Sequence, residues 1–385
     1  GGGGAAGQVM GGAGGGAAGA AGNPAGGGAG QAAGGAAGCL DPAAFAASFA
    51  IADSTFCAVA LYTAPESIGF QAPTWGSHGG PLVVQKGAAS GTAGASGSAV
   101  TLERWTPPAG TTGAMTVQTT SIPAALPGGA FLGAQAVDLP FFGWTAITWI
   151  NAFPNTTGQF EMIANGAIAT TYAVNGAFGV AALPAASSQG RLVYSGLSPL
   201  GTSAAAANGL YEADACSSPT PGLGSGTGCS ASAAVATWGE NSGPVVADSS
   251  GDVFAVMSFF STSTQEGRGF SAASIARGAG PAAGAPLFTL AGFPGSLAAL
   301  SPGTATPGVV VFQPFDSTTF DALDVVEQKF TTTGGSLAVM GTASTLLTVP
   351  SGQMAGLSFL VDGSQRLWVA IGGASSTTYV VLARR

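Results

Sequence analysis

The chain has 385 residues, a formal net charge of −8, and Asp, Glu, Lys and Arg make up only 7% of it. The few basic residues form no run longer than the terminal Arg384-Arg385. This argues against nucleic acid as a partner, because phosphate binding needs clustered positive charge. The low charge also argues against disorder driven by self-repulsion, and 46% hydrophobic residues leave ample material for a core.

Residues 1–38 contain 19 Gly, 13 Ala and no charged residue. Such small side chains bury too little area to offset the entropy of ordering the backbone, so we expect a flexible tether over 1–38 and a folded domain over 39–385. The alternative is a Gly/Ala segment that packs against the domain. A start of this kind resembles the mature form of a bacterial lipoprotein, which implies export to the outer membrane, periplasm or cell surface. Membrane contact is then expected only through an N-terminal lipid anchor.

The four cysteines are Cys39, Cys57, Cys216 and Cys229. An even, sparse set in a chain of this composition predicts two disulfides, and the spacing favours Cys39–Cys57 and Cys216–Cys229. The alternative is four free thiols buried in the core. We expect no metal site, because there is no CxxC pair and a single histidine, His78, cannot complete a Cys/His zinc set.

Along the chain, short apolar runs alternate with clusters of Gly, Pro, Ser and Thr, which predicts many short strands and almost no helix. Six segments read as a strand, a polar turn and a second strand. They are residues 72–86, 131–150, 178–195, 243–258, 295–313 and 356–371. Their second strands start about 45–65 residues apart, a spacing typical of a propeller or a similar array.

Third strands are predicted after these hairpins, at residues 100–105, 158–163, 209–214, 271–277, 320–328 and 377–384. A fourth strand follows in the first five units, for example at 235–239 and 287–292, and four strands make one propeller blade. The sixth unit ends after its third strand. We therefore expect the segment 56–63, FCAVALYT, to pair antiparallel with 378–382 and close the ring.

The units with an Asp/Gly turn resemble those of six-bladed propellers of the NHL and related types, and DGSQRLWVA at 362–370 is similar to repeats of bacterial sensor propellers. The resemblance implies an all-β, six-bladed β-propeller over about residues 56–385. A ring of five or seven blades and a pair of β-sandwiches are the alternatives. The sialidase-type Asp box is not matched, because Leu360 stands where that motif has Ser.

Catalytic motifs are scarce. A Ser–His–Asp system would depend entirely on His78, which lies in a predicted turn, and neither GxSxG nor HExxH occurs. The segments around Asp248 and Asp252, and DALD at 321–324, are too sparse for a calcium loop. We expect Asp248 and Asp362 to cap their own turns.

Residues on the rim that carries the second-to-third turns and the connections between blades are the candidate ligand-binding set, since ligands of propellers commonly bind there. They are Glu66, Trp238, Glu240, Asn241, Glu266, Arg268 and Asp316. The plainer interpretation is that they are solvated loop residues. Trp149 and Trp368, on predicted second strands, are expected in the core.

Two hypotheses follow from this pattern. The first is a non-enzymatic binding module for a glycan, a peptide or an envelope protein, without a cofactor. The second is a carbohydrate-active hydrolase or lyase that uses two of the rim carboxylates, which would have to lie roughly 5–10 Å apart. The scarcity of catalytic motifs favours binding.

Overall fold

A computed structural model describes residues 38–68, 73–86, 100–122, 131–139, 143–151, 157–175, 177–183, 190–202, 206–216, 222–223, 231–238, 241–259, 261–276, 279–353, 356–372 and 376–385. The chain divides into the units Gly1–Ala37 and Gly38–Arg385, and every described residue belongs to the second. The predicted tether therefore lies outside the described residues, apart from Gly38. No helix in the described part is long and apolar enough to cross a membrane.

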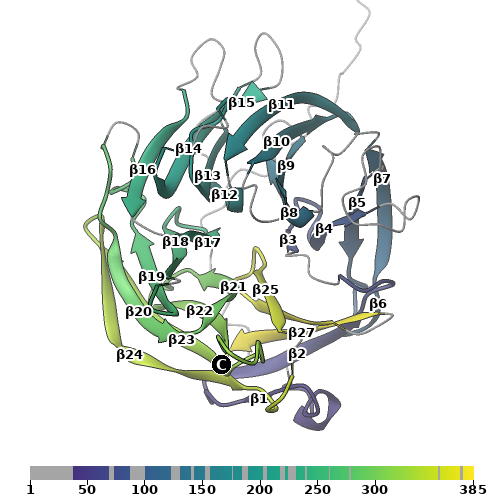
Figure 1. Ribbon diagram of the computed structural model, residues 1–385. Helices are drawn as coiled ribbons and strands as arrows, with labels where there is room; N and C mark the ends of the chain where they lie inside the picture. The colour runs from purple at the N-terminus through teal and green to yellow at the C-terminus, as the bar shows by residue number, and fades with distance from the viewer. Residues whose placement is uncertain are drawn as a thin grey trace, which may run out of the picture. The chain divides into compact units, whose positions relative to one another are not determined.

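The second unit is an all-β, six-bladed propeller, which confirms the predicted fold (Figure 1). Six antiparallel sheets follow one another around a central axis. Within each blade of the first three, the four main strands follow in chain order from the inner to the outer edge of the ring. Blade 1 contains β3 (Thr74–Trp75), β4 (Pro81–Lys86), β5 (Val100–Thr106) and β7 (Thr116–Ile122); blade 2 contains β8 (Phe131–Leu139), β9 (Trp144–Asn151), β10 (Thr157–Ala164) and β11 (Ala167–Asn175); blade 3 contains β12 (Ala177–Leu183), β13 (Gly190–Gly196), β14 (Asn208–Cys216) and β16 (Ala233–Trp238).

The other three blades have the same order, except that the outer strand of blade 6 comes from the start of the domain. Blade 4 contains β17 (Asn241–Ala247), β18 (Val253–Phe259), β19 (Thr264–Phe270) and β20 (Ala285–Ala291); blade 5 contains β21 (Phe293–Leu300), β22 (Gly308–Phe315), β23 (Val325–Thr333) and β24 (Ser336–Thr348); blade 6 contains β25 (Leu357–Val361), β26 (Leu367–Gly372), β27 (Thr377–Arg384) and β2 (Phe56–Thr63). Short additions are the 3₁₀ turn η1 (Pro42–Ala44), β1 (Ala50–Ile51) beside β24, β6 (Thr112–Ala114) beside β2, and β15 (Gly222–Leu223) beside β14.

Blade 6 combines both ends of the domain, as predicted. Strand β2 pairs antiparallel with β27 from Phe56 opposite Arg384 to Thr63 opposite Thr378, with a bulge between Ala58 and Ala60. The first long strand thereby completes the last sheet and removes an open edge. On its other side β2 carries the parallel strand β6, so that β2 has partners along both edges.

The core consists of apolar clusters between neighbouring blades, and strand β26 shows why. Its side chains alternate between two directions. Leu367 and Val369 pack into the cluster shared with Val309 and Val311 of blade 5, whereas Trp368 packs with residues of blade 1. Both faces of a second strand are therefore buried, which explains why these strands are continuous apolar runs in the sequence.

Two third strands differ from the prediction. In blade 4 the strand is β19, Thr264–Phe270, and the predicted segment 271–277 begins with turns. The inward positions of β19 include Gly267 and Gly269. A Cβ on Gly267 would clash with the Phe288 ring, so only glycine fits at this position. The strand therefore lacks the alternating apolar side chains by which a strand is recognised in the sequence. In blade 5 the strand begins at Val325, because the first residues of the predicted 320–328 segment belong to a loop.

The disulfide between Cys39 and Cys57 is confirmed, with a Cα–Cα distance of 5.6 Å. Cys216 is also disulfide-bonded. Its predicted partner, Cys229, lies outside the described residues.

Trp368 is almost fully buried, as expected for a core residue, whereas the side chain of Trp149 lies outside the described part.

Candidate functional site

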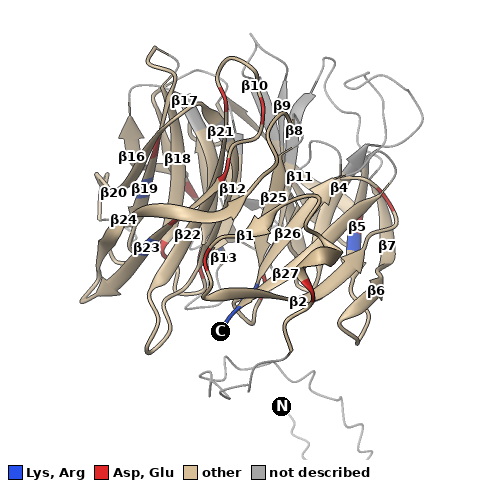
Figure 2. Ribbon diagram, turned by 90° about the horizontal axis from the view of Figure 1, so that it is seen from below, with Lys and Arg blue, Asp and Glu red and all other residues tan. Residues whose placement is uncertain are grey.

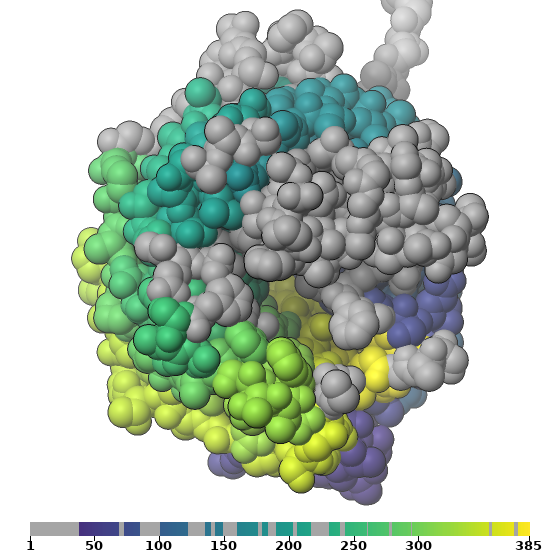
Figure 3. All heavy atoms as spheres, viewed as in Figure 1, coloured from purple at the N-terminus to yellow at the C-terminus, as the bar shows by residue number. Residues whose placement is uncertain are grey.

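The propeller has two rims, which are formed by different turns and carry different polar residues. We call the rim formed by the first-to-second and third-to-fourth turns the turn rim, and the opposite one, formed by the second-to-third turns and the connections between blades, the connection rim. The side view in Figure 2 shows the C-terminus, which follows β27, at the turn rim. Figure 3 looks onto the connection rim, where the surface is hollowed near the centre of the ring.

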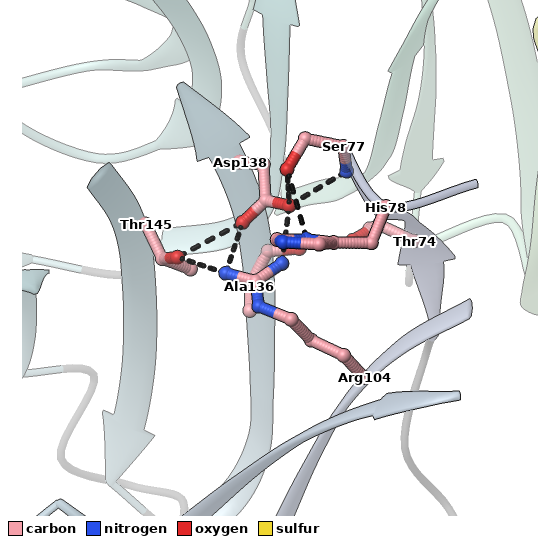
Figure 4. A network of polar contacts seen from close by, with 7 residues as sticks. All are labelled: Thr74, Ser77, His78, Arg104, Ala136, Asp138 and Thr145. Atoms are coloured by element: carbon pink, nitrogen blue, oxygen red, sulfur yellow. Dashed lines mark hydrogen bonds and ion pairs between the residues drawn. The ribbon is translucent and has the colours of Figure 1, made fainter. Parts of the chain in front are cut away.

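On the turn rim, polar side chains of blades 1 and 2 meet around Asp138 of β8 (Figure 4). Arg104 of β5 donates to both carboxylate oxygens, with Nη1–Oδ2 at 2.5 Å and Nη2–Oδ1 at 2.9 Å. Thr145 donates to Oδ1 at 2.9 Å, and the amide and hydroxyl of Ser77 donate to Oδ2 at 2.7 and 2.8 Å. Burial alone would raise the pKa of Asp138, but these hydrogen bonds and the charge of Arg104 hold it below its ordinary value.

His78 does not complete a catalytic triad in this network. Its Nδ1 lies 3.3 Å from Ser77 Oγ, and Ser77 donates its proton to Asp138 rather than to the imidazole. A triad needs the opposite order, with the histidine between the hydroxyl and the carboxylate. The network therefore links blade 1 to blade 2, and the exposed His78 lies at its edge.

The aspartates of the turn rim cap their own turns, as predicted. Asp362 Oδ1 accepts from the amides of Ser364 and Arg366, both at 2.9 Å, and its Oδ2 accepts from Trp368 Nε1 at 2.9 Å. Asp248 Oδ1 accepts from the amides of Ser250 and Asp252 at 2.9 and 3.0 Å. Among the described residues, no group of three or more His, Cys, Asp or Glu side chains could hold a metal ion.

On the connection rim, Glu66 and Asp316 are in loops but in different blades. Glu66 is exposed in the connection from β2 to β3. Asp316 follows β22 and accepts from the amides of Thr318 and Thr319, both at 2.8 Å, which lowers its pKa. Asp316 therefore serves its own loop. Glu240 lies outside the described residues.

Glu266 and Arg268 lie within strand β19 and not in a loop, which corrects the predicted placement. The reason is that β19 starts at Thr264, so the turn before it is shorter than the sequence pattern indicated. The two side chains form an ion pair, with Arg268 Nε and Glu266 Oε1 2.7 Å apart, and both are partly exposed. Arg268 also donates to the carbonyl oxygen of Ala283 at 2.7 Å.

Register places this ion pair at the boundary between blades 3 and 4. Arg268 lies opposite Ala255, and alternation puts Glu266 on the same face. Ala255 belongs to the apolar cluster against which Trp238 of blade 3 packs. Trp238 ends β16 and Asn241 begins β17, so the connection between these blades lies at the same boundary. Four of the seven candidate residues thus surround one blade boundary.

Asn208 is a residue that the sequence did not single out. It begins β14 and lies directly opposite Trp238 in the β14–β16 pair. Both residues are half-buried, and neither Asn208 Oδ1 nor Trp238 Nε1, both buried atoms, has a hydrogen-bond partner. No pattern in the sequence marks Asn208, because Trp238, its neighbour across the strand pair, lies 30 positions later in the chain.

Phe320 was also missed. It is 55% exposed in the loop after Asp316, has a positive φ of 59°, and stacks on Phe293 with ring centroids 5.5 Å apart. It lies at the start of a predicted third strand, 320–328. A bulky residue in the left-handed region is uncommon and costs about 1–3 kcal/mol, so the loop around it must enforce this geometry.

No family model matches the chain, and no curated protein matches it. Among solved structures, a protein of unknown function from Dyadobacter fermentans is 12% identical, over 86% of this chain and 100% of that one, with a TM-score of 0.45. A glucose dehydrogenase is 10% identical, over 82% and 98%, with a TM-score of 0.45. The SapL1 lectin in complex with alpha methyl fucoside is 11% identical, over 79% and 89%, with a TM-score of 0.38. At these values the likeness says nothing about activity, and the function has to be inferred from this chain's own residues.

Proposed function

We propose that this protein is a non-enzymatic binding module whose ligand contacts the connection rim at the boundary between blades 3 and 4. The observation that carries the proposal is that Trp238 and the Glu266–Arg268 ion pair flank the same blade boundary. Trp238 lies at its connection-rim end, and Arg268 reaches toward the turn rim, where it donates to Ala283. An indole supplies a flat apolar surface with a polar edge, and a partly exposed ion pair supplies both hydrogen-bond donors and acceptors. This combination suits a small polar ligand such as a glycan unit.

Two of the candidate carboxylates already have partners within the protein, which supports binding over catalysis. Glu266 is paired with Arg268, and Asp316 accepts hydrogen bonds within its own loop. An acid/base pair for glycoside hydrolysis needs two carboxyl groups that face one scissile bond. Glu66, Glu266 and Asp316 come from three different blades or connections, and none of them donates to or accepts from another.

A carbohydrate-active hydrolase is the second candidate, favoured by one observation. Glu103 of β5 has a raised pKa, caused mainly by burial and in part by the charge of Glu66. Acid/base hydrolysis uses two carboxyl groups, one of which has a raised pKa. Glu103 is only 4% exposed, however, and its Oε2 accepts from Trp105 Nε1 at 2.7 Å. The group therefore faces the core, and we rank this candidate below binding.

The Cys39–Cys57 disulfide supports a site of action outside the cytoplasm, since reducing compartments do not keep structural disulfides. We therefore propose an exported protein. Fractionation of the producing cell, with labelling of free thiols, would check this. Free thiols at both positions in the purified native protein would contradict it.

The binding proposal is tested by titrating the protein with a panel of soluble mono- and disaccharides and of short peptides, followed by saturation-transfer NMR and calorimetry. We expect Trp238→Ala to weaken binding at least about tenfold, which corresponds to 1.4 kcal/mol. His78→Ala, an exposed change on the opposite rim, is the matched control and should leave affinity unchanged. Absence of binding by the whole panel, or loss of binding in His78→Ala instead, would refute the proposal. Appearance of cleaved sugar that depends on Glu103 would favour the hydrolase.

A further inference from the structure

We infer that the loop between β22 and β23, residues 316–324, binds an arginine side chain of a peptide or protein partner, with the guanidinium group stacked on the exposed ring of Phe320. We call this segment the acidic loop; it belongs to blade 5 and to the connection rim. The inference goes beyond the proposed function and does not depend on it, because it uses different residues from those at the boundary between blades 3 and 4. It starts from an aromatic ring that the folded chain holds in solvent.

Phe320 and Leu323 give the acidic loop an exposed apolar surface. Four large apolar side chains are exposed in the described part of the chain, and two of them, Phe320 at 55% and Leu323 at 37%, belong to this loop. One face of the Phe320 ring rests on Phe293, with ring centroids 5.5 Å apart and ring planes at 11° to each other. The exposed area of Phe320 is therefore its opposite face and its edge. Figure 3 looks onto this rim, and the light green atoms of this part of the chain are visible there.

The backbone of the acidic loop fixes the ring in this position. The amide of Phe320 donates to the carbonyl oxygen of Asp316 at 3.1 Å, and the amide of Asp316 donates to the carbonyl oxygen of Asp321 at 2.8 Å. The amide of Leu323 donates to the carbonyl oxygen of Pro314 at 3.0 Å. A ring that is already held in its exposed position loses little conformational freedom when a partner binds.

The acidic loop also carries unpaired negative charge. It contains Asp316, Asp321 and Asp324 and neither Lys nor Arg, and in the described part of the chain none of the three aspartates forms an ion pair. Asp316 and Asp324 accept from backbone amides through Oδ1, which leaves the Oδ2 of each for another donor. These amides lower the pKa of Asp316, so its carboxylate is ionised at neutral pH. A cationic group of a partner would meet an aromatic face and carboxylates in the same loop.

The combination of a flat ring and carboxylates selects arginine among the possible ligand groups. A guanidinium group is planar, stacks on aromatic faces and keeps its N–H donors at the edge for carboxylate oxygens. A lysine ammonium group is a compact and more strongly hydrated charge, so it gains less from the ring. A phosphate or carboxylate would meet like charges, and a neutral sugar would leave the aspartates without a counter-charge. Leu323 offers apolar surface to the aliphatic stem of the arginine.

The experiment uses short capped peptides with one arginine between two leucines. In the counterparts this arginine is replaced by lysine, by alanine or by citrulline, which has the shape of arginine without its charge. Binding is followed by NMR of the isotope-labelled protein. We expect the lysine peptide to bind at least about threefold more weakly than the arginine peptide, and the citrulline and alanine peptides at least about tenfold more weakly. Raising NaCl from about 0.05 to about 0.5 M should weaken the arginine peptide, because salt screens exposed charges.

Protein variants test the ring and the charges separately. Phe320→Gly removes the ring and suits the positive φ of 59°, so we expect a Tm within about 2 °C of the wild type and an affinity for the arginine peptide about two- to fivefold lower. The double variant Asp321→Asn and Asp324→Asn should reduce the difference between the arginine and citrulline peptides. Met340→Ala, an exposed apolar change on β24, and Asp41→Asn, an exposed carboxylate that caps η1, are the matched controls and should bind like the wild type.

Several results would overturn the inference. Equal binding of the arginine and citrulline peptides would refute recognition of the charge, and equal binding of the arginine peptide by Phe320→Gly and the wild type would refute the stacking. Absence of peptide binding would refute the inference as well, and the proposed function would stand if a sugar binds and Trp238→Ala weakens it. Conversely, binding of the arginine peptide that depends on Phe320, without any binding that Trp238→Ala weakens, would support the inference and refute the proposed function.

Discussion

At the scale of single residues, equivalent turns of different blades share their backbone and differ in their side chains. The turns that follow β3, β17 and β25 are closed by the same hydrogen bond, from the amide of the first residue to the carbonyl oxygen of the fifth, in Gly76–Gly80, Asp248–Asp252 and Asp362–Arg366. The Oδ2 of Asp362 accepts from Arg366 and Trp368, whereas the buried Oδ2 of Asp248 has no partner. Burial, and after it the charge of Asp252, raises the pKa of Asp248 from 3.8 to about 6.

This raised pKa makes the free energy of unfolding depend on pH. The folded state binds the proton more tightly than the unfolded state, so this carboxyl group lowers stability as the pH rises from about 4 to 6. In Asp248→Asn an oxygen can still accept from Ser250 and Asp252, but the charge is gone. We expect the variant to be more stable than the wild type at pH 8 by about 1–3 kcal/mol, and equally stable at pH 4. Urea unfolding at both pH values checks this. A variant less stable at pH 8 would show that the ionised form is favourable.

At the scale of elements, strand β2 combines a bulge with pairing on both edges. Val59 lies at the bulge and has no Cα partner on β27, whereas Leu61 pairs with Val380. The amide of Leu61 also donates to the carbonyl oxygen of Thr111 at 2.8 Å. A residue at a bulge contributes less to the backbone pairing between strands than a residue that has a neighbouring strand paired on each side.

Proline substitutions should separate these two positions. Leu61→Pro removes the hydrogen bond to Thr111 and leaves that oxygen without it, so we expect a loss of about 2 kcal/mol or more. Val59→Pro should cost at least about 1 kcal/mol less, because the extra residue of a bulge is left out of the ladder. Urea unfolding of the two variants, both of which lose a half-buried apolar side chain, gives the comparison. Equal losses would mean that the bulge is held as firmly as the paired strand.

At the scale of the whole molecule, the N-terminal part of the folded unit ties the ring together. Phe45 and Phe49 are buried in the cluster between blades 5 and 6, and β1 pairs with β24 of blade 5. The Cys39–Cys57 disulfide then fixes this segment to β2. Closing a loop of 18 residues contributes about 3 kcal/mol in the chain-entropy model.

Two truncations test the closure of the ring. Deleting residues 1–37 removes a segment that is mostly Gly and Ala and has no charged residue, and it keeps Cys39, so we expect an unchanged Tm. Deleting residues 1–64 removes the disulfide, both phenylalanines and β2, and leaves β27 with an open edge. We expect this protein to be unfolded or to aggregate at 25 °C. Calorimetry and size-exclusion chromatography measure both. A stable monomer without residues 1–64 would show that β2 is dispensable for the ring.

The fold class, the six repeats and the closing strand could all be predicted from the sequence. Second strands such as β18 and β22 are buried on both faces, so their apolar runs are visible without any partner. The closing strand was found because the sixth unit lacked a fourth strand, which is a property of the repeat. The turns around Asp248 and Asp362 depend on neighbours within four positions, and local chemistry therefore predicts them.

Which polar residues lie next to one another could not be predicted in the same way. Strand β19 was displaced in the prediction because the Phe288 ring, from the next strand, fills the space at Gly267. Asn208 lies beside Trp238 only because of the register between β14 and β16. The charge of Asp138 is balanced by Arg104, which comes from another blade. Contacts of this kind depend on how sheets are placed around the ring, and no periodic pattern in the sequence records that placement. The physical reason is that a repeat encodes the burial of each strand, whereas a site depends on single side chains brought together across blades.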